Sequence, residues 1–347
     1  MRRIRLMVVS LGCLAVIHLL VLLAGFVSPY DFAAQDRELP YSPPTRIHWI
    51  SEKGRLLILH PFVYRWVERG GEPERYEEDH SVRYPIHALS RGTEYTIGGA
   101  VTWDRHLFGV DPPARLFLLG SDGYGRDLFS RLLFGGRISL FAGLVATLLS
   151  LTFGVTLGTL AGFYGGWPDA LIMRGVELFL ALPWLYLLLA LRGLLPLRTS
   201  PQQAFMLFVI VIGLVGWARP ARLIRGVVLS VKERKHVLAA RSFGASDLYV
   251  VRCHILPEVR GVVLTQAALL IPQYVLAEVT LSFLGLGVGE PIPSWGGMLA
   301  TLQQYHVLVS QWWMFFPGLM LIPVILSYGM LSHSLQDGRS YIRSWTE

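Results

Sequence analysis

The sequence predicts an all-α, polytopic membrane protein with about six transmembrane helices. Of its 347 residues, 53% are hydrophobic and only 16% are charged, a composition typical of a chain that lipid covers. Apolar runs of roughly 20 residues, the length that crosses a bilayer, recur along the chain with polar segments between them. The net charge of +7 is concentrated in loops beside these runs, so we expect contact with a lipid membrane and not with nucleic acid.

Six apolar runs are predicted to span the membrane. They are Leu6–Val27, Ile138–Phe163, Leu171–Leu195, Ala204–Trp217 with an extension toward Leu229, Gly261–Leu284 and Trp312–Leu335. The first is too long for the core of a signal peptide, so residues 1–28 are interpreted as an uncleaved transmembrane anchor. In the fourth, Arg219 and Pro220 follow a short apolar run, and Pro183 is expected to kink the third. Small residues of the second span are expected to allow close helix packing: Gly143, Ala146, Gly154, Gly158 and Gly162.

Residues 29–120 have the composition of a soluble segment, with near-balanced charge and many prolines. We expect them to form an extracytoplasmic loop or small domain inserted after the first helix. Thr45–Tyr64 is predicted to form a β-hairpin that turns at Glu52–Gly54, and the acidic segment Glu68–Asp79 is expected to be solvated. The histidines of this region are too scattered for a metal site and are interpreted as exposed loop residues: His48, His60, His80 and His87.

Lysine and arginine residues predict the orientation of the chain, because cytoplasmic loops carry an excess of them. Arginines precede the first span, and nine basic residues lie between Arg219 and Arg260. The loop Gly285–Gln311 has neither lysine nor arginine. With six spans, the N-terminus, the segment between the fourth and fifth spans and the tail 339–347 are therefore all predicted to be cytoplasmic.

The polar hairpin, Val237–Pro257, lies between two apolar spans and is too polar to sit in lipid. It is predicted to form a helix, a break at Gly244, and a second helix that ends at Pro257. An apolar stripe at helical spacing is expected on the second helix: Leu248, Val250, Val251 and Ile255. Such a hairpin is suited to a groove on another protein. The alternative is an ordinary amphipathic cytoplasmic loop.

The polar hairpin resembles the EAA loop of ABC importer permeases, the element that enters the ATPase subunit. Leu238 stands where the family has the glutamate that names the motif. By this resemblance, the residues expected to couple the chain to an ATPase are Ala239, Ala240, Gly244, Ala245, Asp247, His254, Leu256 and Pro257.

Two further segments resemble the C-type subunit of dipeptide and oligopeptide permeases. Leu119–Leu133 is similar to that family's LGTDxxGRDxxSRLL segment, and Leu281–Val288 is followed by prolines and Ser-Trp-Gly. Family residues expected near the outer face are Asp122, Gly125, Arg126, Asp127, Ser130, Arg131, Ser282, Gly285, Gly287, Ser294, Trp295 and Gly296. The resemblance covers roughly Leu119–Arg339, and the loop 29–120 is longer than is usual in the family.

The resemblance implies a MetI-like ABC permease bundle over 121–338, with a coupling loop at 231–258. It implies a non-enzymatic subunit of an ATP-driven importer in the cytoplasmic (inner) membrane, without cofactors, that carries di- or oligopeptides. The implied partners are a second, B-type permease, two ATP-binding subunits and an extracytoplasmic substrate-binding protein. Alternative substrates in the same family are a nickel chelate, glutathione or a microcin-like peptide, and a membrane-anchored sensor is the alternative function.

Charged residues within and beside the spans have two interpretations. Asp122, Arg126, Asp127 and Arg131 lie at helical spacing near the start of the second span. Mutual ion pairing there is favoured over contact with substrate. Glu278 lies inside the fifth span, where a carboxylate is costly, so it is expected to face the interior or the translocation path. Its candidate partners are the amino terminus of a substrate, Arg137, or the partner permease.

No catalytic or metal-binding residue is predicted. The sequence has no HExxH, GxSxG or P-loop motif, and the glycines from Gly285 to Gly289 follow a span without the strand–helix context of a nucleotide loop. Tight turns are the role we expect for them. Cys13 and Cys253 lie in different kinds of segment and are expected to form neither a disulfide nor a metal site.

Overall fold

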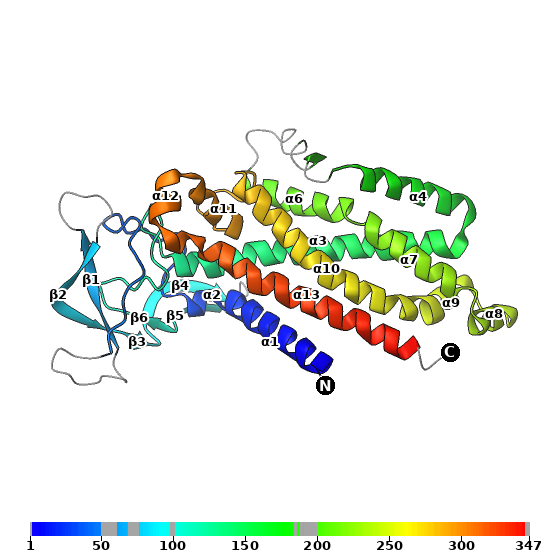
Figure 1. Ribbon diagram of the computed structural model, residues 1–347, viewed down its shortest axis with the longest axis horizontal. Helices are drawn as coiled ribbons and strands as arrows, with labels where there is room; N and C mark the ends of the chain where they lie inside the picture. The colour runs from blue at the N-terminus through cyan, green and yellow to red at the C-terminus, as the bar shows by residue number, and fades with distance from the viewer. Residues whose placement is uncertain are drawn as a thin grey trace. The chain divides into compact units, whose positions relative to one another are not determined.

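The structure, a computed structural model, describes residues 2–49, 61–68, 76–97, 101–183, 186–187, 190 and 200–343. The chain forms two compact units. The helical unit consists of Met1–Leu14, Leu140–Glu278 and Pro323–Glu347, and the mixed unit of Ala15–Ser139 and Val279–Ile322. Helices dominate, as predicted (Figure 1). The longest are α1 (Arg2–Leu22), α3 (Leu128–Tyr164), α10 (Leu256–Phe283) and α13 (Phe316–Arg343).

Five helical segments among the described residues are long and apolar enough to cross a membrane. They are Arg5–Leu22, Leu128–Tyr164, Phe205–Val231, Asp247–Phe283 and Trp312–Gln336. These correspond to the first, second, fourth, fifth and sixth predicted spans. The fourth consists of α6 (Pro201–Val215) and α7 (Ala218–Val231), so the predicted extension past Pro220 is confirmed.

The third predicted span is described only in its first half, as α4 (Gly166–Ala181). Part of its second half, including 191–199, lies outside the described residues, so the total of six spans stays a prediction. At Pro183 the structure has a break in the helix and not the simple kink that was expected, because α4 ends two residues before it and residues 186, 187 and 190 are helical again. Leu182 has an extended backbone (φ −76°, ψ 126°), the conformation favoured before proline, and this ends the helix.

Glycines of α3 form the close contacts predicted for the second span. They lie one helical turn apart and face α7 in the helical unit. A Cβ at Gly158 would lie 2.5 Å from the Ala221 carbonyl oxygen, and one at Gly162 would lie 3.0 Å from that of Arg225. No side chain fits at these positions, so the backbones of α3 and α7 approach closely.

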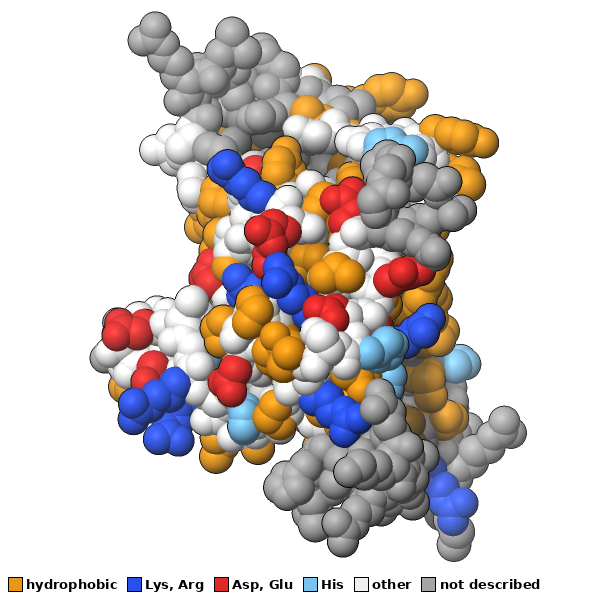
Figure 2. All heavy atoms as spheres, turned by 90° about the vertical axis from the view of Figure 1, so that its left-hand side faces the viewer, with side chains coloured by type: hydrophobic (Ala, Val, Ile, Leu, Met, Phe, Trp, Pro, Cys, Tyr) orange, Lys and Arg blue, Asp and Glu red, His pale blue; other side chains and the backbone are white. Residues whose placement is uncertain are grey.

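The described residues of the mixed unit form three two-stranded antiparallel sheets between positions 62 and 109. The pairs are β1 (Phe62–Glu68) with β2 (Tyr76–Pro85), β3 (His87–Ala88) with β6 (Phe108–Gly109), and β4 (Arg91–Ile97) with β5 (Val101–Arg105). Acidic and basic side chains are intermixed on the face that carries β1 and β2 (Figure 2). The insertion therefore adds strands to a chain predicted as all-α.

The predicted hairpin over Thr45–Tyr64 is described only at its base. His48 and Phe62 form an antiparallel bridge, with N–O distances of 2.9 and 3.1 Å, and the turn at Glu52–Gly54 lies outside the described residues. The expectation that the acidic segment is solvated is wrong for Glu78. This residue belongs to β2, its side chain is only 8% exposed, and it lies 3.1 Å from His48 Nε2.

Short helices complete the mixed unit. They are α2 (Ala24–Val27), α11 (Trp295–Ala300), α12 (Tyr305–Ser310) and the 3₁₀ turns Thr301–Gln303 and Trp312–Phe315. Ala24 and Val27 of α2 are buried with Leu133 of α3. Trp313 is buried and donates Nε1–H to the Ser121 carbonyl over 3.1 Å, which ties the start of the last span to the segment before α3.

Candidate functional site

The polar hairpin folds as two helices around a glycine turn, as predicted. The first helix is α8 (Lys235–Ser242), and the second begins with α9 (Asp247–Val250). Gly244 has φ +83°, in the left-handed region where glycine avoids the strain of a side chain. The Ser246 hydroxyl caps the second helix by accepting a hydrogen bond from Tyr249 N.

Pro257 does not end the second helix, which corrects the sequence prediction. The chain passes from α9 through one π-helical turn (Val251–Ile255) directly into α10. Proline has no N–H and cannot close an α-type bond, so it fits best in the first turn of a helix or where the hydrogen-bond pattern is already interrupted. Here Leu256 N bonds to Val251 O, which is the wider π pattern, and Pro257 follows at once. The second helix of the hairpin is therefore continuous with the fifth span.

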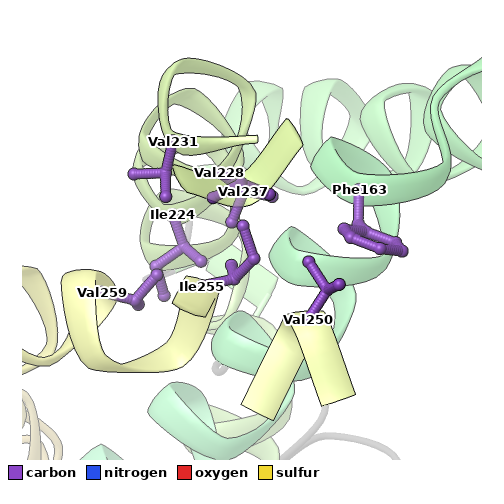
Figure 3. Close-up of a cluster of buried hydrophobic side chains, with 8 residues drawn as sticks. All are labelled: Phe163, Ile224, Val228, Val231, Val237, Val250, Ile255 and Val259. Atoms are coloured by element: carbon purple, nitrogen blue, oxygen red, sulfur yellow. The ribbon is translucent and has the colours of Figure 1, made fainter. Parts of the chain in front are cut away.

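A buried cluster fastens the hairpin to the spans of the helical unit (Figure 3). Its members are at most 4% exposed: Phe163, Ile224, Val228, Val231, Val237, Val250, Ile255 and Val259. Val237, Val250 and Ile255 come from the hairpin and are fully buried. Each such side chain contributes on the order of 1.5–3 kcal/mol by leaving water. The cluster therefore joins α8 and α9 to α3, α7 and α10.

The opposite side of the hairpin exposes large apolar side chains. Phe243 is 91% exposed at the turn and Leu248 is 74% exposed on α9. Leu238 and Tyr249 are about half exposed. Leu248 and Val250 are predicted to share one apolar stripe, and this is wrong. Two residues along a helix correspond to a rotation of about 200°, which places them on opposite sides.

Polar contacts brace the base and the turn of the hairpin. Arg241 reaches across the turn to Asp247 over 3.5 Å, and its guanidinium lies 4.6 Å from the ring centre of Phe163. Arg234 pairs with Glu258 over 3.1 Å. Of the other residues predicted for this site, Ala239, Gly244 and Pro257 are exposed, and Ala240, Ala245, His254 and Leu256 are half-buried.

The acidic and basic residues around the start of α3 form ion pairs in the mixed unit, as favoured from the sequence. Arg126 donates Nε–H to Asp122 Oδ2 over 2.7 Å, and Arg131 Nε lies 3.5 Å from the same oxygen. Asp127 instead caps α3, because it accepts hydrogen bonds from the backbone and hydroxyl of Ser130. Burial raises the pKa of Asp127 to about 7, against the effect of these hydrogen bonds.

Sequence reasoning missed the acid that completes this cluster, Glu290. Its carboxylate accepts hydrogen bonds from both Arg126 and Arg131, with Oε1 3.1 Å from Nη2 of each. The residues are about 160 positions apart, so no local spacing connects them. The available signal was compositional, since Glu290 is the only acid in the loop Gly285–Gln311, which has no lysine or arginine.

The segment from Ser282 to Gly296 makes tight turns, as expected from its glycines. Gly285 has φ +77°. At Gly287 a Cβ would lie 1.8 Å from Ser282 Oγ, and at Gly296 one would lie 2.3 Å from the Val279 carbonyl oxygen. These glycines permit close backbone contacts that a side chain would block.

Trp295 locks this segment to α3. It is fully buried, and its Nε1–H donates to the Leu132 carbonyl over 2.9 Å. Ser294 caps α11 by accepting from Gly297 N over 3.1 Å. Gly125, also of the predicted set, has φ +70° and packs against Asp36 O. The predicted outer-face residues therefore lie in the mixed unit, where their contacts hold the start of α3 and the segment Ser282–Gly296 in place.

Glu278 is buried within α10, with 1% of its surface exposed, as predicted for a carboxylate inside a span. Arg137, one of its candidate partners, donates to the carbonyls of Val21 (2.9 Å) and Leu22 (2.7 Å). The partner of Glu278 stays a prediction. Across the described part of the chain, no group of His, Cys, Asp and Glu is arranged to hold a metal, and both cysteines are free.

Comparison with known proteins gives one family. Residues 154–339 match the model of the binding-protein-dependent transport system inner membrane component. The chain is 36% identical to the dipeptide transport system permease protein DppC of Bacillus subtilis, over 65% of this chain and 69% of that protein. It is 36% identical to the oligopeptide transport system permease protein OppC of Haemophilus influenzae, over 63% and 68%. It is 34% identical to the glutathione transport system permease protein GsiD of Pectobacterium atrosepticum, over 65% and 72%.

Proposed function

The chain belongs to the family of binding-protein-dependent transport system inner membrane components, and from this premise we propose that it is a C-type permease subunit of an ATP-driven importer for di- or oligopeptides. The observation that carries the proposal is the polar hairpin, which is apolar and exposed on one side and buried in the spans on the other. The subunit moves substrate without catalysing a reaction of its own.

The hairpin is the proposed contact with an ATP-binding subunit. Phe243 and Leu248 offer apolar area at the tip of a short helical element, the kind of surface that fills a groove on a partner. Leu238 is half exposed where the family motif carries a glutamate. The groove of this chain's partner is therefore expected to accept an apolar side chain at that position.

The buried cluster explains how motion of the ATP-binding subunit reaches the membrane. Val237, Val250 and Ile255 are packed against residues of α3, α7 and α10, and protein interiors deform little because they are closely packed. A displacement of the hairpin would therefore move these three helices with it. The continuity of α9 with α10 through the π turn supplies a second, covalent connection.

The remaining parts of the assembly follow from the same premise. We propose a second, B-type permease beside this chain, two ATP-binding subunits at the cytoplasmic face and a substrate-binding protein outside. In this arrangement the chain lies in the cytoplasmic membrane, with the hairpin, the N-terminus and the tail 339–347 in the cytoplasm and residues 29–120 outside. Glu278 is the residue proposed to face the translocation path.

Di- and oligopeptides are the proposed substrates because the relatives named above carry those names, and glutathione is itself a short peptide. The direct test is uptake into proteoliposomes that contain the complete assembly with ATP inside. Uptake of a labelled dipeptide that requires ATP and the binding protein, and that unlabelled oligopeptides reduce, supports the proposal. Transport of glutathione with no competition from other peptides would replace it.

A further inference from the structure

The β4–β5 hairpin of the insertion is fastened to the end of the first span, within the mixed unit (Figure 1). The ring of Tyr95 lies directly over Gly25 of α2, where a Cβ would come within 2.4 Å of it. Leu107 N, just after β5, donates to the Phe26 carbonyl over 2.7 Å. The hairpin therefore packs against α2, which directly follows the helix of the first predicted span.

His106 adds a second connection at the same level. Its imidazole is buried, with Nδ1 2.6 Å from the Ser28 carbonyl oxygen and Nε2 3.0 Å from that of Thr93. Ser28 follows α2 directly, and Thr93 lies in β4. A side chain within hydrogen-bond distance of both carbonyls holds the hairpin against the end of α2.

The strand register decides which side chains share the face of Tyr95. Tyr95 pairs with Trp103, and Thr96 pairs with Thr102. Directly opposed residues of an antiparallel pair point to the same face, and neighbours along a strand point to opposite faces. Trp103 and Val101 therefore lie on the face that Tyr95 seats on α2, and Thr102 lies on the other.

The part of this face beyond Tyr95 is apolar and exposed. Trp103 is 48% exposed and Val101 is 57% exposed. Below it, the last turns of α1 also expose apolar side chains, with Val16 at 56%, Leu19 at 54% and Leu22 at 70%. The helical segment Arg5–Leu22 is long and apolar enough to cross a membrane, so these exposed side chains suit contact with lipid, and the hairpin packs on α2, which follows α1 directly.

We propose that the Val101–Trp103 face of the β4–β5 hairpin binds the phospholipid interface of the outer leaflet. Tryptophan and tyrosine favour that layer, because an apolar ring with a polar edge suits the boundary between hydrocarbon and headgroups. The insertion then rests on the membrane at a fixed place beside the first span. The assignment of leaflet rests on the proposed orientation, whereas contact with lipid does not.

The test is fluorescence quenching from within the lipid. The full-length chain carries Cys13→Ser and Cys253→Ser, and a single cysteine is introduced as Val101→Cys or Trp103→Cys and labelled with the fluorophore NBD. The protein is placed in nanodiscs of phosphatidylcholine and phosphatidylglycerol, with or without lipid bearing a nitroxide high on its acyl chain. Both labels are expected to lose most of their emission to the nitroxide lipid and little to aqueous iodide. Val101→Cys keeps Trp103, so the test stands if the tryptophan variant folds poorly.

Two controls sit on the same insertion. Thr102→Cys lies between the two test positions on the opposite face, and Val82→Cys on β2 is an apolar site of similar exposure, 49%. Both are expected to respond to iodide and not to the nitroxide lipid. Equal quenching at 101, 102 and 103 by iodide alone would overturn the proposal. A second result would also overturn it: the nitroxide lipid does not quench the labels at 101 and 103, and iodide stops quenching them only when the binding protein is added. That face would then bind protein.

Discussion

Substitutions at Gly244 distinguish two effects: backbone strain in the hairpin turn, and contact of the turn with the groove of a partner. Gly244 has φ +83°, and apart from its two neighbours in sequence no described residue lies within 4 Å of a Cβ added there. An ordinary L-residue in this conformation costs roughly 1–2 kcal/mol, with no clash inside the chain. In the free chain, Gly244→Ala is therefore expected to favour relaxed turns over the strained turn that fits the partner, which weakens attachment of the ATP-binding subunits by up to about 5- to 30-fold. Insertion of the chain is expected to be unchanged.

Gly244→Asp adds a charge at the proposed contact. A carboxylate buried in a groove without a partner costs about 3–5 kcal/mol, which lowers affinity by roughly two to three and a half orders of magnitude. Gly244→Asn is the matched control, because asparagine has the same size and tolerates positive φ.

The assay measures binding of purified ATP-binding subunits to the permease pair in nanodiscs, together with substrate-stimulated ATP hydrolysis. The expected order of affinity is glycine, then asparagine, then alanine, with aspartate far below. Wild-type binding and hydrolysis in the Gly244→Asp complex would refute the assignment of the hairpin as the coupling element.

Three other outcomes are expected. Glu278→Gln should leave the assembly folded but impair uptake, and Glu278→Leu should impair uptake more strongly. The measurement is uptake normalised to expression, and normal uptake by the leucine variant would contradict the prediction. Glu290→Gln should lower the thermal stability of the purified chain at pH 7 by about 1 kcal/mol at most, since the side chain is 60% exposed. Burial raises the pKa of Glu290, but hydrogen bonds from Arg126 and attraction to the neighbouring arginine leave it lowered. The carboxylate of Glu290 therefore stabilises the fold fully above pH 4.5, its ordinary pKa, and this contribution is lost as the pH falls through its lowered pKa in the folded protein. A difference in stability between Glu290→Gln and wild type that persists in acid would refute the pairing. For orientation, an impermeant thiol reagent should label Val82→Cys in intact cells and Phe243→Cys only after permeabilisation, and the reverse pattern would invert the topology.

Hydrophobic length and local turn chemistry predicted much of the helical unit. A run of apolar residues needs no knowledge of its neighbours to identify a span, and Gly244 breaks a helix by its own conformational freedom. The close helix packing at the glycines of α3 was also predictable, because Gly158 and Gly162 lie one turn apart on the same face. These features depend on neighbours within a few positions in the sequence.

Features that depend on distant contacts were missed. Glu290 meets Arg126 across more than 160 residues, and no spacing rule connects them. The prediction of one stripe with both Leu248 and Val250 is wrong, because residues two positions apart on a helix point to opposite sides. Pro257 was read as a helix end because the π turn that accommodates it has no sequence signature of its own.

Site-specific photocrosslinking at Phe243 tests most directly whether the hairpin docks on an ATP-binding subunit. A benzophenone amino acid replaces Phe243, the most exposed of the large hydrophobic side chains described. The same substitution at Trp167, which is 75% exposed on α4, serves as the matched control. In membranes that hold the complete assembly, the account predicts a crosslink from position 243 to the ATP-binding subunit, and a different or weaker pattern from position 167. Crosslinks from position 243 only to lipid or to other parts of the same chain would contradict it.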